Sequence, residues 1–61
     1  MSVDEGSAAR AVRVLLDAAA GHERAVGFVW CAYRFICDSR EWTMPGDLAD
    51  RYFAHTFGGP R

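Results

Sequence analysis

The stretch AVGFVWCAYRFIC, residues 25–37, decides how this chain folds, because it is the longest apolar run and only Arg34 interrupts it. Plotted at 100° per residue, the segment 22–40 is apolar around about two-thirds of its circumference. A surface helix needs an apolar stripe of only about 100° or somewhat more. The sequence therefore predicts a central helix that requires neighbours on most of its sides.

Helical periodicity also appears on both sides of this segment. Residues 7–20 and residues 47–57 each place their larger apolar side chains on one face and charged side chains on the other. No alternating pattern typical of strands occurs. We predict an all-α fold, a helical hairpin plus a short third helix that form a small three-helix domain, which dimerisation could complete. The helices are expected at about 7–20, 22–40 and 47–57, in one domain 1–61 with frayed ends at 1–6 and 58–61.

Glycine and proline mark the predicted helix ends. Gly21 is expected to end the first helix in the left-handed conformation, and Pro45 to separate the second from the third. Asp4 or Ser7 is a candidate N-cap of the first helix, and Thr43 or Asp47 of the third. One continuous helix over residues 8–40 is the alternative, because apolar positions keep an alternating 3-4 spacing across Gly21. We favour the hairpin, since an unbroken segment beyond about 25 residues is long for a small globule.

Length and composition limit what this chain can do. It has 61 residues, enough for one small domain, and 51% are hydrophobic, but ten of these are Ala. A chain this short buries only about 60% of its unfolded surface. Its stability is therefore expected to be marginal without a second copy or a partner. All seven basic residues are Arg, which indicates a GC-rich genome, and small accessory proteins of phages and plasmids share this size and composition.

The charge balance and the N-terminus bear on partners and location. The formal net charge is −1, without the basic excess typical of nucleic-acid binders. As a helix, the apolar run would span roughly 20 Å, against about 30 Å of hydrocarbon in a bilayer, so no membrane span is predicted. The acidic N-terminal residues 1–6 are unlike a signal peptide. We expect a cytoplasmic protein with reduced thiols.

The sequence offers little for catalysis or metal binding. Cys31 and Cys37 are six residues apart, which turns them about 240° from one another on a helix, so they are not expected to share an ion. Cys37 is predicted to be a core residue and Cys31 to be partly exposed. His22 is expected to be a polar loop residue or a contact at a helix N-terminus, and His55 to be a solvated side chain. We predict no enzymatic activity, no cofactor and no metal, with a small enzyme or metal protein as the third interpretation.

The aromatic side chains suggest a function. Phe28 or Phe35, together with Tyr33 and Phe53, is expected to fill the core. Trp30 and Phe35 point about 140° apart, so two small neighbouring helices are not expected to cover both. Uncovered aromatic surface beside Arg is typical of interaction sites. The predicted partner-binding residues are Trp30, Phe35, Phe28, Tyr33, Arg34, Trp42 and Phe57.

We therefore predict a small protein-binding module that acts as a homo-oligomer (a homodimer in the simplest case), an accessory subunit or an inhibitor. The alternative is a small DNA-binding regulator of helix-turn-helix type, with Gly21 in the turn. Helix 22–40 offers Arg24, Arg34 and Arg40 to DNA, but acidic residues lie among them and would face phosphate. Nucleic acid is the less favoured partner for this reason.

Overall fold

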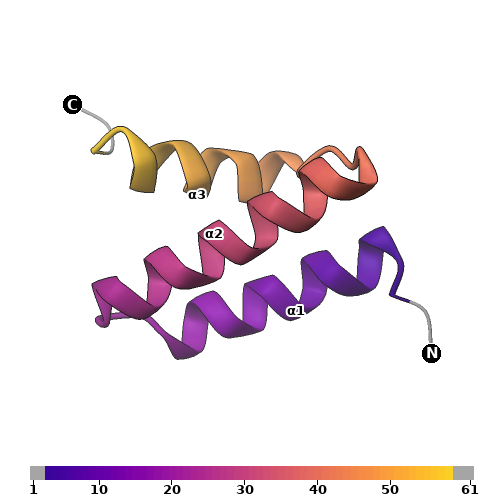
Figure 1. The fold of residues 1–61 in the computed structure, drawn as a ribbon. Helices are drawn as coiled ribbons and strands as arrows, with labels where there is room; N and C mark the ends of the chain where they lie inside the picture. Colours follow the sequence, from indigo (N-terminus) through magenta and orange to yellow (C-terminus); the bar gives the residue numbers. More distant parts are fainter. Residues whose placement is uncertain (1–2, 59–61) are drawn as a thin grey trace.

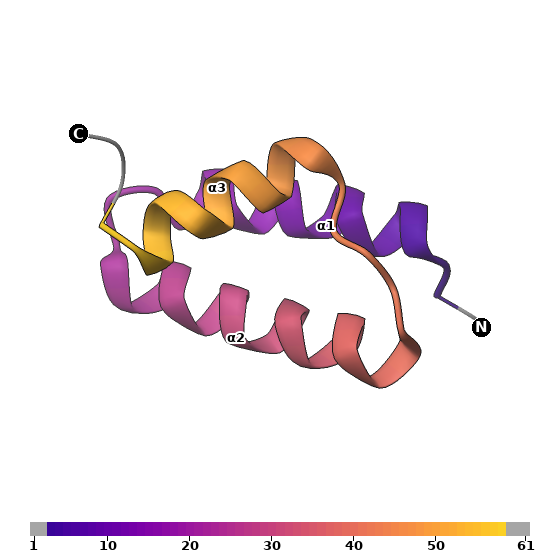
Figure 2. The same cartoon turned by 90° about the horizontal axis from the view of Figure 1, so that it is seen from above.

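The computed structural model describes residues 3–58 and contains three helices, α1 (Glu5–Ala18), α2 (Glu23–Arg40) and α3 (Gly46–Thr56). No strand occurs in this part of the chain. Helices α1 and α2 form an antiparallel hairpin, and α3 returns along it in the direction of α1 (Figures 1 and 2). The predicted all-α hairpin with a short third helix is confirmed.

The first helix begins and ends two residues earlier than predicted. Asp4 is its N-cap, and the carboxylate accepts a hydrogen bond of 2.6 Å from the backbone N–H of Ser7. This bond holds the pKa of Asp4 below its usual value. Gly21, in the connection to α2, has a φ of 89°, which favours glycine. The chain reverses here, so the continuous helix over residues 8–40 is excluded.

The link between α2 and α3 corrects another prediction. Glu41 ends α2 in the left-handed conformation, and the N–H of Trp42 donates to the carbonyl of Cys37 at 2.8 Å. Helix α3 then begins at Gly46, with Pro45 as an N-cap that makes no side-chain hydrogen bond. Capping by Thr43 or Asp47 was therefore wrong, and the carboxylate of Asp47 binds another helix instead.

All three helices contribute to the core. Small residues on α1 let α2 approach closely, and the aromatic rings of α2 fill the space toward α3. Trp30 meets the Tyr52 ring of α3 edge-on at 5.6 Å between centroids. The buried residues are Ala8, Ala9, Val12, Leu16, Trp30, Tyr33, Cys37 and Leu48. The core positions predicted for Tyr33 and Cys37 are confirmed.

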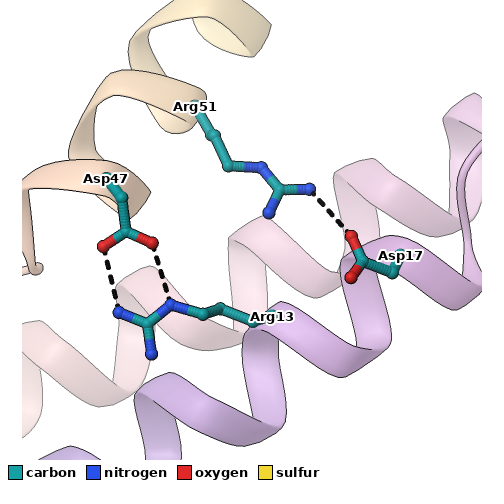
Figure 3. A network of polar contacts seen from close by, with 4 residues as sticks. All are labelled: Arg13, Asp17, Asp47 and Arg51. Carbon is teal, nitrogen blue, oxygen red and sulfur yellow. Dashed lines mark hydrogen bonds and ion pairs between the residues drawn. The ribbon is translucent and has the colours of Figure 1, made fainter.

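Two reciprocal ion pairs join α1 to α3 (Figure 3). Arg13 donates from Nε to Asp47 at 2.8 Å and from Nη2 at 3.0 Å, and Arg51 reaches Asp17 at 3.5 Å. The two helices run in the same direction (Figure 1). Arg13 and Asp17 are four residues apart on α1, and their partners Asp47 and Arg51 are four residues apart on α3, so both pairs form in one register. A slip by one turn would place Asp47 opposite Asp17. These exposed pairs therefore specify register more than they add stability.

Candidate protein-binding face

Two of the predicted partner-binding residues belong to the core. Trp30 is 3% exposed and Tyr33 is 2% exposed, so neither ring is the uncovered aromatic surface that was predicted, although Tyr33 is among the lining residues of a groove described below. Both lie on the stripe of α2 that includes Val26 and Cys37, and this stripe points between the other helices. Burial raises the pKa of the Tyr33 hydroxyl to about 12.

Three other predicted residues are exposed phenylalanines. Phe28 and Phe35 of α2 are 76% and 72% exposed, and Phe57, just after α3, is 67% exposed. The ring of Phe57 stacks on Phe53 at 5.4 Å between centroids. Phe53 is itself 57% exposed, so the predicted core positions of Phe53 and of Phe28 or Phe35 were wrong. The core uses tryptophan and tyrosine, and phenylalanine lies outside.

Arg34 and Trp42, the remaining predicted residues, already have partners within the chain. Arg34 donates to the Asp38 carboxylate at 3.1 Å and to the Tyr52 hydroxyl at 2.8 Å. Trp42 is half-buried, and the guanidinium of Arg40 lies 5.2 Å from the centre of its ring. Both side chains help to hold this chain's own helices and are less available to a partner.

The exposed apolar side chains of α1 and α2 meet along one groove. It has a volume of about 290 Å³ and its lining contains no charged side chain and no residue of α3. We call this surface the open face, and define it by its lining residues Val3, Ala8, Ala11, Val12, Leu15, Phe28, Val29, Ala32, Tyr33 and Ile36. The hairpin thus packs against α3 on one side and has an uncovered apolar groove on a side that α3 does not line.

The large residues of the open face carry much of its exposed surface. Val3 is 49% exposed, Leu15 52%, Phe28 76% and Ile36 38%. Multiplied by the full surface area of each residue type, these fractions give roughly 400 Å² of exposed apolar area, which is the size of the largest apolar patch on a typical soluble monomer. Such a patch is often functional. The open face is the strongest candidate site on the described part of the chain.

The sequence interpretation missed Leu15, Ile36 and Val3 as surface residues. Leu15 belongs to the apolar face of the first predicted helix, and Val3 to the frayed end expected at residues 1–6. One signal was available in the pattern: Ala11 and Leu15 lie on one edge of the α1 apolar arc, while Ala9 and Leu16 lie on the other. An arc this wide needs two neighbours, and α2 alone cannot cover it.

A second groove, about 640 Å³, lies between α2 and α3 and is more polar. Cys31, Arg34, Asp38 and His55 are among its lining residues. Arg34 and Asp38 pair with one another, and Cys31 is exposed, as predicted. No group of three His, Cys, Asp or Glu side chains able to hold a metal occurs within residues 3–58.

Comparisons with protein families, with characterised proteins and with solved structures gave no match to this chain. Of the three described helices, none combines the length and the apolar character needed to span a bilayer. The chemistry and shape of the open face are therefore the basis for considering function.

Proposed function

We propose that this chain is a small protein-binding module and that the open face is its binding surface. The observation that carries the proposal is the gathering of exposed Leu15, Phe28 and Ile36 along one uncharged groove. Apolar surface without charged residues is typical of the centre of protein interfaces, and a central aromatic side chain often supplies much of the binding free energy. Acting as a homo-oligomer, an accessory subunit or an inhibitor would each use this surface.

Binding is favoured over catalysis, although Cys31, Asp38 and His55 share the groove between α2 and α3. Asp38 is already paired there with Arg34, and the Nε2 of His55 lies 3.8 Å from where a Cβ on Gly27 would be. The two cysteines are free thiols, which suits a reducing compartment such as the cytoplasm.

The DNA-binding alternative has less support. In a helix-turn-helix the two helices cross at about 90–120°, whereas α1 and α2 run side by side in opposite directions (Figures 1 and 2). Arg13, Arg34 and Arg51 are each paired with an aspartate. Their charge is therefore partly neutralised before any phosphate could approach.

The test compares Phe28, which lines the open face, with Phe57, a predicted partner-binding residue that lies just after α3 and does not line this face. The wild-type chain, Phe28→Asp and Phe57→Asp are immobilised, incubated with extract of the native host, and the retained proteins are identified by mass spectrometry. We expect Phe57→Asp to retain the same partner, or the same chain, as wild type, and Phe28→Asp to lose it. Circular dichroism checks that both variants keep their helix content. Equal retention by Phe28→Asp would refute binding through the open face.

A further inference from the structure

We infer that the occupant of the open face is a second copy of this chain, docked about a two-fold axis that crosses the groove. This inference rests on the proposed function and specifies its partner. In the resulting dimer, two α1–α2 hairpins face one another as a four-helix core, with one α3 on each outer side.

The available area is enough for a small dimer interface. Phe35 is 72% exposed and lies about 20° from Phe28 around α2, at the edge between the open face and the groove toward α3. With it, each chain offers roughly 550 Å² of apolar surface, so two chains bury about 1,100 Å², which exceeds the about 1,000 Å² that a specific interface needs. The alanines of the face add to this area, since Ala11 and Ala32 are also exposed.

The absence of charge from the lining also favours a second copy. In a two-fold interface the same patch meets itself, so any charged residue near the axis would lie close to its own copy. The lining of the open face contains none. A partner that carried charged anchors would find no counter-charge within the groove and would have to bury them unpaired.

Both ends of the groove carry large apolar side chains. Leu15 and Phe28 lie near the turn that joins α1 to α2, whereas Val3 and Ile36 lie toward the opposite end. A two-fold axis across the groove exchanges these ends between the two copies. The exposed Phe28 ring of each chain therefore meets the end of the other groove that carries Ile36, and apolar surface covers apolar surface along the whole groove.

The test measures the mass of the full chain in solution by sedimentation over a wide concentration range. Wild type is compared with Phe28→Asp, with Ala11→Trp, which fills part of the groove from an exposed position, and with Phe57→Asp as the matched control off the face. We expect wild type and Phe57→Asp to approach twice the chain mass of 6.8 kDa. The two open-face variants should weaken dimerisation at least roughly thirtyfold, as loss of a central aromatic anchor does.

Binding of the dye 8-anilinonaphthalene sulfonate distinguishes failure of the dimer inference from failure of the proposed function of the open face. A wild-type monomer that binds the dye, and loses it in Phe28→Asp, overturns the second copy but keeps the open face as a binding surface. A monomer whose dye binding is unchanged by Phe28→Asp overturns both proposals. A dimer that survives both open-face variants overturns the assignment of this face as the dimer interface.

Discussion

Leu48 is the residue on which the docking of α3 depends most, and Leu48→Ala tests the three-helix arrangement. Its side chain is 0% exposed, and it is the one residue of α3 among the fully or nearly buried side chains of the described core. The other contacts of α3 include the half-buried Tyr52 ring against Trp30, the hydrogen bond from Arg34 to the Tyr52 hydroxyl and the two exposed ion pairs to α1. Removing the Leu48 side chain should therefore strongly weaken the packing of α3 against the other two helices.

The expected loss can be worked from the burial. Leucine-to-alanine changes at buried sites cost about 2–5 kcal/mol, and α3 lies at the outside of the bundle where it can partly close the gap. We expect Leu48→Ala to lower the free energy of unfolding by about 3 kcal/mol. The total for a chain of this length is about 3–9 kcal/mol. At about 4–8 °C per kcal/mol, the melting temperature should fall by roughly 12–24 °C.

The assay is thermal unfolding followed by far-ultraviolet circular dichroism at one fixed protein concentration, since association would also shift the melting temperature. Phe53→Ala is the matched control, because it changes another large side chain of α3 that is 57% exposed. It should cost less than about 1 kcal/mol. In a Trp42→Phe background, the emission of Trp30 should move to longer wavelength in Leu48→Ala, as the ring loses its cover. If Leu48→Ala costs no more than Phe53→Ala, α3 does not dock as described.

Three further predictions concern charge, thiols and the turn. Asp47 has its pKa lowered to about 2 by its arginine partner, against about 3.9 in an unfolded chain, so the pair stabilises the fold above pH 4 and is lost as the pH falls toward 2. Asp47→Asn should therefore reduce the decrease of the melting temperature between pH 4 and pH 2, and an unchanged pH dependence would contradict the ion pair. A thiol reagent should modify exposed Cys31 in the folded chain, and buried Cys37, whose pKa is raised, only after denaturant is added; equal rates would contradict the burial. Gly21→Ala should cost about 1–2 kcal/mol because φ is positive there, whereas Gly46→Ala, equally free of neighbours but without positive φ, should be close to neutral in the same melting experiment.

The fold could be predicted from the sequence because its signals are local. Gly21 supplies the conformation that reverses the chain, Asp4 caps the first helix, and Pro45 keeps the third separate. Each signal acts within a few residues, so its effect does not depend on distant packing. The cap of α3 was predicted wrongly because the carboxylate of Asp47, a good capping residue, pairs with Arg13 on another helix instead.

The site was predicted only in part, since α2 is apolar on both of its sides. Periodicity shows that Trp30 and Phe28 point in different directions, but it does not show which of them faces the other helices. That choice depends on where α3 returns, and α3 is placed by the burial of Leu48 and by its contacts with α1. These are long-range interactions, so they cannot be predicted from the helical periodicity of α2.

The distribution of residue sizes explains why one side of the hairpin stays uncovered. Helix α3 has only eleven residues, and its inner stripe provides Leu48 and Tyr52 to the core. These two side chains are enough to cover the side of α2 that carries Trp30, where the rings of Trp30 and Tyr52 meet. The alanines of α1 bring α1 and α2 close together, which leaves Phe28 and Ile36 projecting beyond the contact between the two helices. A hairpin with apolar side chains on two sides needs two covers, and α3 can provide one. A second hairpin of the same chain, as proposed above, has the size and the lack of charge to provide the other.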